Sequence, residues 1–176
     1  MRCIKSWQTM QRPHRRAAKI AERLYVFLSA ERAERKKVMF LSPSGNRSIM
    51  DINELSSKII GAAIEVHKAL GPGLLESAYE ECLCHELGLQ GMSCDRQRSL
   101  PVKYKGKKLD IGYRLDIVVE NAIILELKSC EKIEPIHKAQ LLTYLKLSGL
   151  SLGLLLNFNV AKMRDGIVRI VNDLKE

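Results

Sequence analysis

The sequence predicts an α/β fold in which helices flank a mixed central sheet of four to five strands, in the order ααβββαβ(β). One stretch carries apolar residues at the 3.6-residue period of a helix, and a second expected helix follows it. Three extended segments joined by short turns follow them, and a third helical stretch then precedes one or two further strands. Helices that alternate with strands in this way are typical of a sheet covered by helices.

The first two expected helices are bounded by clear start and stop signals. Asp51 or Asn53 can cap the first helix, and Gly71-Pro72-Gly73 ends it. Its apolar positions follow the helical period and are Leu55, Ile59, Ala62, Ala63, Val66 and Leu70. The second helix is expected over residues 74–87, with Gly88 as its stop.

The remaining elements are read from alternation and turn residues. Extended segments are expected over residues 99–104, 108–119 and 122–128, with turns at Lys105-Gly106-Lys107 and Glu120-Asn121. Pro135 precedes an expected helix that reaches about residue 147, with Gly149 as its stop. Residues 152–158 form a further expected strand, and residues 167–171 a last one.

The excess positive charge is confined to the N-terminal segment. The chain carries 29 Lys and Arg against 20 Asp and Glu, and residues 1–49 hold 12 of the former and 3 of the latter. Residues 50–176 therefore hold 17 of each and are neutral. We expect two parts: a basic extension over residues 1–49, flexible or partly helical over residues 17–37, and a folded domain over residues 50–176.

Three interpretations of the basic extension stay open. It is an arm that binds nucleic acid, a targeting peptide, or translated sequence upstream of the true start, and we favour the last. Leu41-Ser-Pro-Ser-Gly-Asn46 is typical of a break before the domain. Met50 then stands directly before the first well-formed helix start.

Composition excludes several classes of protein. No apolar run approaches the roughly 18–20 residues that a membrane-spanning helix needs, so no membrane partner is expected. Five cysteines at irregular spacing do not suggest a disulfide framework, and they favour a reducing cytoplasm. The sequence gives no indication of the oligomeric state.

Three charged residues stand among apolar neighbours in the expected strands. Alternation points Glu126 and Lys128 to the same face of their strand, and Asp116 interrupts the strand before it. A two-residue turn would set Asp116 opposite Leu125 and face it away from Glu126. We therefore expect a three-residue loop or a bulge between the two strands.

Two carboxylates beside a lysine have a definite chemical use. Carboxylate oxygens suit Mg²⁺ or Mn²⁺, which activates bound water and offsets charge on a phosphodiester oxygen. A nearby ammonium can stabilise a negative transition state. The alternative is a purely structural ion pair, which a lone acid–lysine pair on a strand does not exclude.

One motif is Asp116 followed, after nine residues, by Glu126-Leu127-Lys128. In this motif the chain resembles the PD-(D/E)XK nuclease superfamily. Gly73, Glu76 and Tyr79 form the G-x-x-E-x-x-Y pattern of its GxxExxY branch. The resemblance covers about residues 50–172 and implies a restriction-endonuclease-like core. It further implies that Asp116 and Glu126 bind the metal, Mg²⁺ or Mn²⁺, and that Lys128 is the catalytic lysine.

The same resemblance assigns supporting residues. Glu76 matches a helix acid that helps to hold the metal, and Tyr79 lies on the same helical face. Gln140 and Tyr144 form a Q-x-x-x-Y pair, as in RecB-like and lambda-exonuclease-like relatives, aimed toward substrate or Lys128. His67 faintly resembles a metal-binding helix histidine, although a lone helix histidine is more often structural.

These residues predict a metal-dependent nuclease, that is, a hydrolase acting on phosphodiester bonds. DNA is the expected substrate. The alternative is a non-catalytic nucleic-acid-binding or scaffold module that retains the nuclease fold. The neutral charge of residues 50–176 supports that alternative, because DNA enzymes usually present a basic surface. A lysine cluster at one hairpin turn could supply a local patch or be a solvated loop; it comprises Lys103, Lys105, Lys107 and Lys108.

Overall fold

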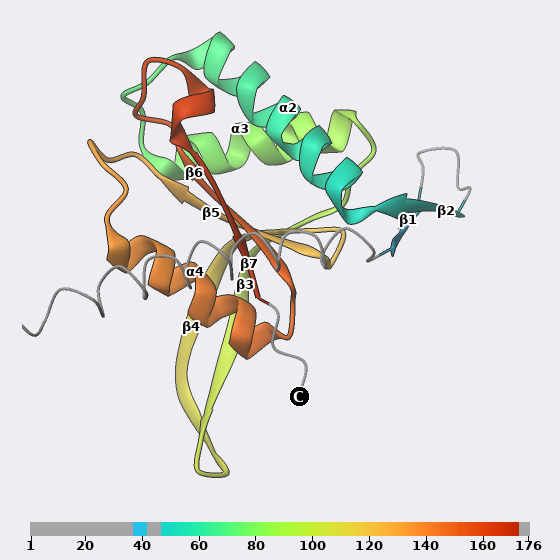
Figure 1. Cartoon of the computed structure of the whole chain (residues 1–176), viewed down its shortest axis with the longest axis vertical. Helices are drawn as coiled ribbons and strands as arrows, with labels where there is room; N and C mark the ends of the chain where they lie inside the picture. The colour runs from blue at the N-terminus through green and yellow to red at the C-terminus, as the bar shows by residue number, and fades with distance from the viewer. Residues whose placement is uncertain (1–36, 42–46, 173–176) are drawn as a thin grey trace, which may run out of the picture.

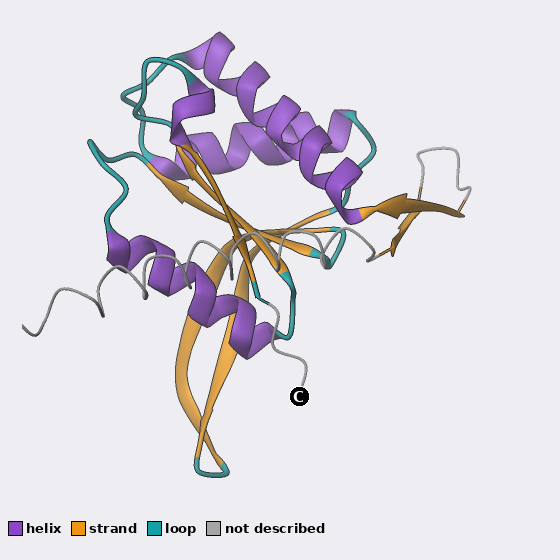
Figure 2. Ribbon diagram, viewed as in Figure 1, coloured by secondary structure: helices purple, strands orange, loops and turns teal. Residues whose placement is uncertain are grey.

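The structure, a computed structural model, describes residues 37–41 and 47–172 (Figure 1). Within these ranges, two helices cover one face of a five-stranded sheet and a third covers the other face (Figure 2). A small two-stranded sheet leads into the first of these helices. The expected mixed α/β fold, with helices around a central sheet, is confirmed.

The helices and strands follow one another in the expected order. Their bounds are β1 (Lys37–Leu41), β2 (Arg47–Asp51), α2 (Ile52–Leu70), α3 (Glu76–Leu89), β3 (Cys94–Tyr104), β4 (Lys107–Val119), β5 (Ile123–Lys128), α4 (Pro135–Ser148), β6 (Leu152–Asn157), the 3-10 helix η1 (Met163–Gly166) and β7 (Ile167–Val171). The large sheet has the order β3-β4-β5-β6-β7. β5 and β6 run parallel, and the other neighbours are antiparallel.

The helix termini show which signals acted as expected. The Asp51 carboxylate caps α2 by accepting a 2.7 Å bond from Asn53 N, and Gly71 ends the helix at φ 69°. Gly149 ends α4 in the left-handed conformation. The expected stop at Gly88 was wrong, because α3 continues to Leu89. None of the helices in the described ranges has the length and apolarity to cross a bilayer.

Two differences from the expected strands occur where polar residues interrupt the apolar alternation. β3 begins at Cys94 rather than at residue 99, since its first residues lack apolar alternation but pair with the end of β4. The hairpin of β1 and β2 was not expected, yet its Val38 and Met50 are buried in the main core cluster. The helix expected over residues 17–37 and the break over residues 41–46 lie outside the described residues, apart from Lys37 and Leu41 in β1.

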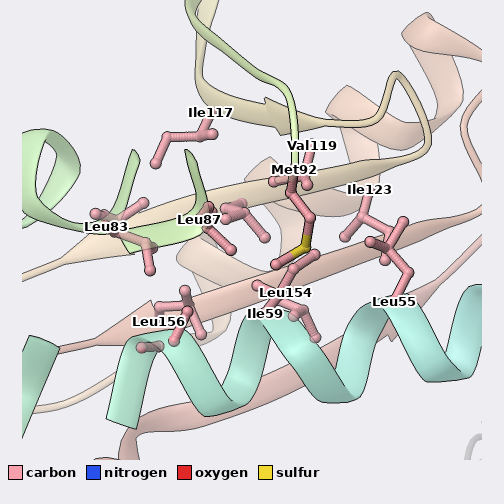
Figure 3. Close-up of a cluster of buried hydrophobic side chains, with 14 of the residues drawn as sticks. Leu55, Ile59, Leu83, Leu87, Met92, Ile117, Val119, Ile123, Leu154 and Leu156 are labelled. Carbon is pink, nitrogen blue, oxygen red and sulfur yellow. The ribbon is translucent and has the colours of Figure 1, made fainter. Parts of the chain in front are cut away.

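The main core lies between the sheet and the pair α2 and α3. Figure 3 shows side chains of both helices meeting alternate residues of β4, β5 and β6. The labelled residues are Leu55, Ile59, Leu83, Leu87, Met92, Ile117, Val119, Ile123, Leu154 and Leu156. The odd-numbered residues of β5 thus face these helices, which turns Glu126 to the α4 side.

A smaller core lies between the sheet and α4. It includes Ile124 and Leu155 from the sheet and Leu141 and Tyr144 from the helix. Gly153 of β6 lets α4 approach, because a Cβ at this position would lie 2.8 Å from Leu141 Cδ1. Leu141 is fully buried and has little room to move.

We expect Gly153→Ala to lower the free energy of unfolding by about 1–3 kcal/mol, because the added methyl overpacks the Leu141 contact. Gly61→Ala is the matched control, since a Cβ there meets nothing within 4 Å on the exposed side of α2. That control should gain up to about 1 kcal/mol from helix propensity. Urea unfolding measures both, and equal effects of the two substitutions would contradict the close approach of α4.

Candidate functional site

The connection between β4 and β5 has the length that the site requires. Val119 pairs with Ile123, so residues 120–122 form a three-residue loop, as expected. Glu120 and Asn121 both take φ 50°, a left-handed conformation that asparagine tolerates better than most residues. The same register pairs Ile117 with Leu125 and so brings Asp116 level with Glu126.

β4 separates from β5 at Asp116. The pairing of the two strands ends at Ile117 and Leu125, and the Asp116 carboxylate itself accepts a 2.8 Å hydrogen bond from Leu127 N. On the other side of β4, the register places Gln97 opposite Asp116, and Gln97 has φ 49°. Asp116 therefore lies at an irregular point of the sheet, where its side chain takes a position that a backbone carbonyl would otherwise hold.

Glu126 is a buried carboxylate paired on one side only. Its residue is 2% exposed in the middle of the sheet. Lys128 Nζ donates a 2.7 Å hydrogen bond to Glu126 Oε1. The other oxygen, Oε2, is buried and accepts no hydrogen bond within the described part of the chain. An unpaired buried carboxylate oxygen is costly, and a cation is the partner that would relieve the cost most.

Burial and mutual repulsion both act on the two acids. Burial, and then the neighbouring Asp116 charge, raise the pKa of Glu126 to about 7 against the attraction of Lys128. Burial also raises the pKa of Asp116, although the hydrogen bond from Leu127 N opposes it. Burial alone would lower the pKa of Lys128, but its bond to Glu126 and the surrounding acids outweigh burial and raise it.

Glu76 reaches this cluster from the N-terminus of α3. Its carboxylate accepts a 3.0 Å hydrogen bond from Ser129 N, the residue after Lys128. Its charge also contributes to the pKa values of Asp116, Glu126 and Lys128. The structure thus brings Glu76 beside the acids that the sequence grouped with it.

Tyr79 lies inside the protein instead. It is fully buried, and its hydroxyl donates a 2.6 Å bond to Gly71 O and accepts a 3.1 Å bond from Leu74 N. Its ring stacks on Phe158, with 4.3 Å between the centroids. Both hydrogen-bonding capacities of the hydroxyl are used within the fold, so Tyr79 supports the turn before α3.

Gln140 and Tyr144 form the pair that their spacing suggested. Gln140 Nε2 donates a 2.7 Å bond to the Tyr144 hydroxyl. Burial raises the pKa of Tyr144, and the charges of Glu126 and Asp116 raise it further. This pair flanks the acids from the α4 side of the sheet.

His67 is engaged elsewhere. One ring nitrogen, Nε2, lies 2.9 Å from Val160 O, and the ring centroid lies 6.3 Å from that of Phe158. His67 is not among the residues whose charges shift the pKa values of Asp116, Glu126 and Lys128. Its position fits the structural interpretation of a helix histidine.

Sequence reasoning missed three residues that hold the site in place. Glu80 is buried, accepts bonds from Arg96 and Gln97, and adds negative charge near Asp116. Asn157 is the last residue of the apolar strand β6. Its side-chain amide accepts a hydrogen bond from Cys130 N and donates one to Cys130 O. A polar residue at the end of a buried strand was a visible signal for Asn157, but nothing local marked Glu80 or Ser129.

The metal-binding capacity of the site rests on its acids. In the described part of the chain, no group of three or more His, Cys, Asp and Glu side chains is arranged so that it could hold a metal ion. One oxygen each of Asp116, Glu126 and Glu76 is hydrogen-bonded to protein. The unpartnered Glu126 Oε2 nonetheless fits a hard divalent cation, which prefers carboxylate oxygens.

The fold and this cluster together define a domain of nuclease type. A family model described as the PD-(D/E)XK nuclease superfamily matches residues 53–170. The chain therefore belongs to the PD-(D/E)XK nuclease superfamily, whose members generally use divalent metals and act on nucleic acid. The match does not distinguish the narrower GxxExxY family. Searches of curated proteins and of solved structures find no match.

The raised pKa of Glu126 predicts a pH-dependent stability. The folded protein holds this proton more tightly than the unfolded chain, where the pKa is near 4.5. The tighter proton binding stabilises the folded protein fully below about pH 4.5, the pKa of the unfolded chain. This stabilisation is lost as the pH rises through about 7. Without metal, the free energy of unfolding should fall by roughly 1–3 kcal/mol more in the wild type than in Glu126→Gln between about pH 5 and about pH 8.

Urea unfolding in a chelating buffer measures this difference. Glu131→Gln is the matched control, since Glu131 is exposed between β5 and α4 and should leave the wild-type pH dependence unchanged. An equal decline with pH in the wild type and in Glu126→Gln would contradict the raised pKa.

Proposed function

We propose that this domain is a metal-dependent nuclease that hydrolyses phosphodiester bonds, with DNA as its preferred substrate. The observation that carries the proposal is Glu126, buried beside Asp116 and Lys128 with one oxygen unpartnered. A structural ion pair would be expected to satisfy both oxygens of such a buried acid. The arrangement is better explained as a site that a cation completes.

Asp116, Glu126 and Glu76 would hold Mg²⁺ or Mn²⁺. Each of these carboxylates has one oxygen bonded to a protein donor, which fixes its orientation. When bound, the cation supplies a more acidic water and offsets negative charge on the phosphodiester. We leave His67 out of the proposed ligand set because its Nε2 is bonded to Val160 O.

Lys128 is the proposed catalytic lysine. Its side chain is 16% exposed, so the ammonium lies at the edge between the buried acids and solvent. From there it can donate to the phosphodiester oxygens, where negative charge grows in the transition state. The bond to Glu126 holds the ammonium in place and keeps it charged.

Gln140 and Tyr144 are proposed to contact the substrate phosphate. Gln140 already donates to Tyr144, which leaves the Tyr144 hydroxyl free to donate in turn. This donor lies on α4, opposite the α3 helix that carries Glu76. A strand crossing the site would thus meet polar groups from both sides of the sheet.

A non-catalytic nucleic-acid-binding or scaffold module is the second candidate. The equal numbers of acidic and basic residues over 50–176 favour it, because such a domain lacks the general attraction that DNA enzymes use. In that case Asp116, Glu126 and Lys128 would contribute to stability alone. Cleavage and metal affinity together distinguish the two candidates.

Lys128→Ala should abolish cleavage while retaining metal binding. Loss of the ammonium removes stabilisation of the transition state, so we expect the rate to fall at least about 100-fold. The full chain and the variant are incubated with Mg²⁺ or Mn²⁺ and single-stranded DNA, duplex DNA or RNA, with chelator controls. Calorimetry with Mn²⁺ reports metal affinity separately.

The matched control is Lys138→Ala, an exposed lysine of α4, which should cleave as the wild type does. Mn²⁺ binding without cleavage of any of the three substrates by the wild type would favour the non-catalytic module. Chelator-resistant cleavage would contradict a metal-dependent centre.

The long β3–β4 hairpin is proposed as the basic contact with the nucleic-acid backbone. Figure 1 shows the two strands extending together well beyond α4 to their turn. Lys105 and Lys107 are exposed at this turn, next to the exposed ring of Tyr104. The side chains of Lys103 and Lys108 lie outside the described part of the structure.

Replacing Lys105 with Asn and Lys107 with Gln should weaken binding of DNA and flatten its dependence on salt. Asn suits position 105, where φ is 47°. Two lost phosphate contacts should reduce the slope of log affinity against log salt by about 1–2. Fluorescence anisotropy over a salt series measures the slope. The double control Lys58→Gln with Lys68→Gln removes the same charge from α2, and an equal loss there would contradict a role for the hairpin.

A further inference from the structure

An open pocket adjoins the site on the α3 side. Its volume is about 610 Å³, and it is lined by the turn over residues 73–77 together with Ser129 and Asn159. This volume falls within the range of roughly 300–1,000 Å³ that is common for small-molecule sites. Glu76 is the one proposed metal ligand in its lining, whereas Asp116, Glu126 and Lys128 do not line it, so most of the pocket needs a separate explanation.

The wall of the pocket is held rigidly by hydrogen bonds within the protein. The Tyr79 hydroxyl bonds Gly71 O and Leu74 N, as described above. Ser129 Oγ donates a 2.8 Å bond to Leu74 O, so both backbone polar groups of Leu74 are satisfied. Gly73 takes φ 100°, a conformation that a residue with a side chain rarely adopts. The turn therefore has a fixed shape before any ligand arrives.

The fixed turn keeps two leucines in contact with solvent. Leu74 is 41% exposed and Leu75 is 78% exposed, although each could bury apolar area in a differently folded turn. Leu75 is the N-cap of α3 and makes no side-chain capping bond, a position where Ser, Thr, Asp or Asn is usual. The turn thus gives up a capping bond and presents apolar surface at the rim of the pocket.

The pocket is connected to the proposed chemistry through Glu76 and Ser129. Both residues line it, and they are joined by the 3.0 Å bond from Ser129 N to the Glu76 carboxylate. Ser129 directly follows Lys128 in the chain. The wall of the pocket thus begins at the residue that directly follows the proposed catalytic lysine.

The lining suits an uncharged group. Leu74 and Leu75 offer apolar surface, and Ser77 and Asn159 offer a hydroxyl and an amide. The lining contains no lysine or arginine, and its one charged residue is the acid Glu76. A phosphate finds no basic side chain in this lining, whereas a base can pack on the leucines and hydrogen-bond to the amide.

We propose that this pocket binds the unstacked nucleoside next to the cleaved phosphodiester, so that the substrate is single-stranded nucleic acid or a frayed strand end. The inference rests on the proposed nuclease function and specifies its substrate class. A base inside a paired and stacked duplex cannot enter such a pocket without being unstacked, which costs a few kcal/mol. Single strands present their bases without that cost.

The test measures binding apart from cleavage. Lys128→Ala in the full chain serves as the background, with Mn²⁺ present, and fluorescence anisotropy reports the affinity for a labelled single strand and for the matched duplex. Adding Leu75→Ala and Asn159→Ala should weaken single-strand binding about 5–20-fold, within the range measured for base stacking on proteins. Duplex affinity and Mn²⁺ affinity should stay within twofold of the background.

Leu89→Ala is the matched control. Leu89 is a leucine of similar exposure, 69%, at the opposite end of α3, and its loss should leave single-strand affinity unchanged. Unchanged single-strand affinity in the Leu75→Ala and Asn159→Ala variant would overturn the pocket proposal. Equal losses for single strand and duplex would overturn it as well.

A second measurement needs no change to the pocket. A single abasic position is moved along the labelled strand, and one position flanking the cleaved bond should weaken binding by the same factor as the pocket substitutions. That abasic strand should then bind equally well with the pocket intact or substituted. An equal loss of affinity at every abasic position would overturn the pocket proposal. Failure of the wild type to bind Mn²⁺ or to cleave nucleic acid would instead count against the proposed nuclease function.

Discussion

The burial of a carboxylate in the central strand is the constraint on which the rest of the structure depends. Glu126 is 2% exposed in a strand whose other residues, apart from Lys128, are apolar. A charge in such a place costs several kcal/mol unless it is paired. Lys128 pairs with one oxygen, and the three-residue loop brings Asp116 level with Glu126 although the two acids repel each other. The sheet accepts this arrangement only where β4 separates from β5 and the Asp116 carboxylate replaces a backbone acceptor.

The end of β5 is fixed by contacts from α3 and from the end of the neighbouring strand β6. Glu76 of α3 accepts a bond from Ser129 N, and Phe158 N donates a 2.8 Å bond to Lys128 O. Asn157 then holds Cys130 through two further bonds. Three consecutive residues at the carboxyl end of an apolar strand are thereby immobilised. Such preorganisation is what electrostatic catalysis requires, because charged groups that are already in place need not reorganise during the reaction.

Sequence periodicity predicted the layers well, because it reports which face of each helix or strand is buried. It predicted the order of the helices and strands and the loop of residues 120–122, which followed from the need to bring Asp116 and Glu126 together. It failed where a polar stretch is held by distant partners. The start of β3 is stabilised by Glu80 of α3, which binds Arg96 and Gln97, and no local signal shows that contact. Ser129 also has no local signal, because its hydrogen-bond partners Glu76 and Leu74 lie more than fifty positions away in the chain.

The glutamate and the tyrosine of the G-x-x-E-x-x-Y pattern illustrate why spacing alone misplaces a side chain. Glu76 and Tyr79 are three apart on α3, which suggests a shared orientation. Yet Glu76 is exposed in the first turn of the helix, where the chain enters beside the end of β5, whereas Tyr79 is fully buried one turn later against Phe158. The tyrosine fixes the turn through Gly71 and Leu74, and that turn delivers Glu76 to Ser129. One residue of the pattern therefore holds the backbone and the other presents charge to the site. The pattern can be understood as a device for anchoring an acid at a helix N-terminus that has no side-chain cap of its own.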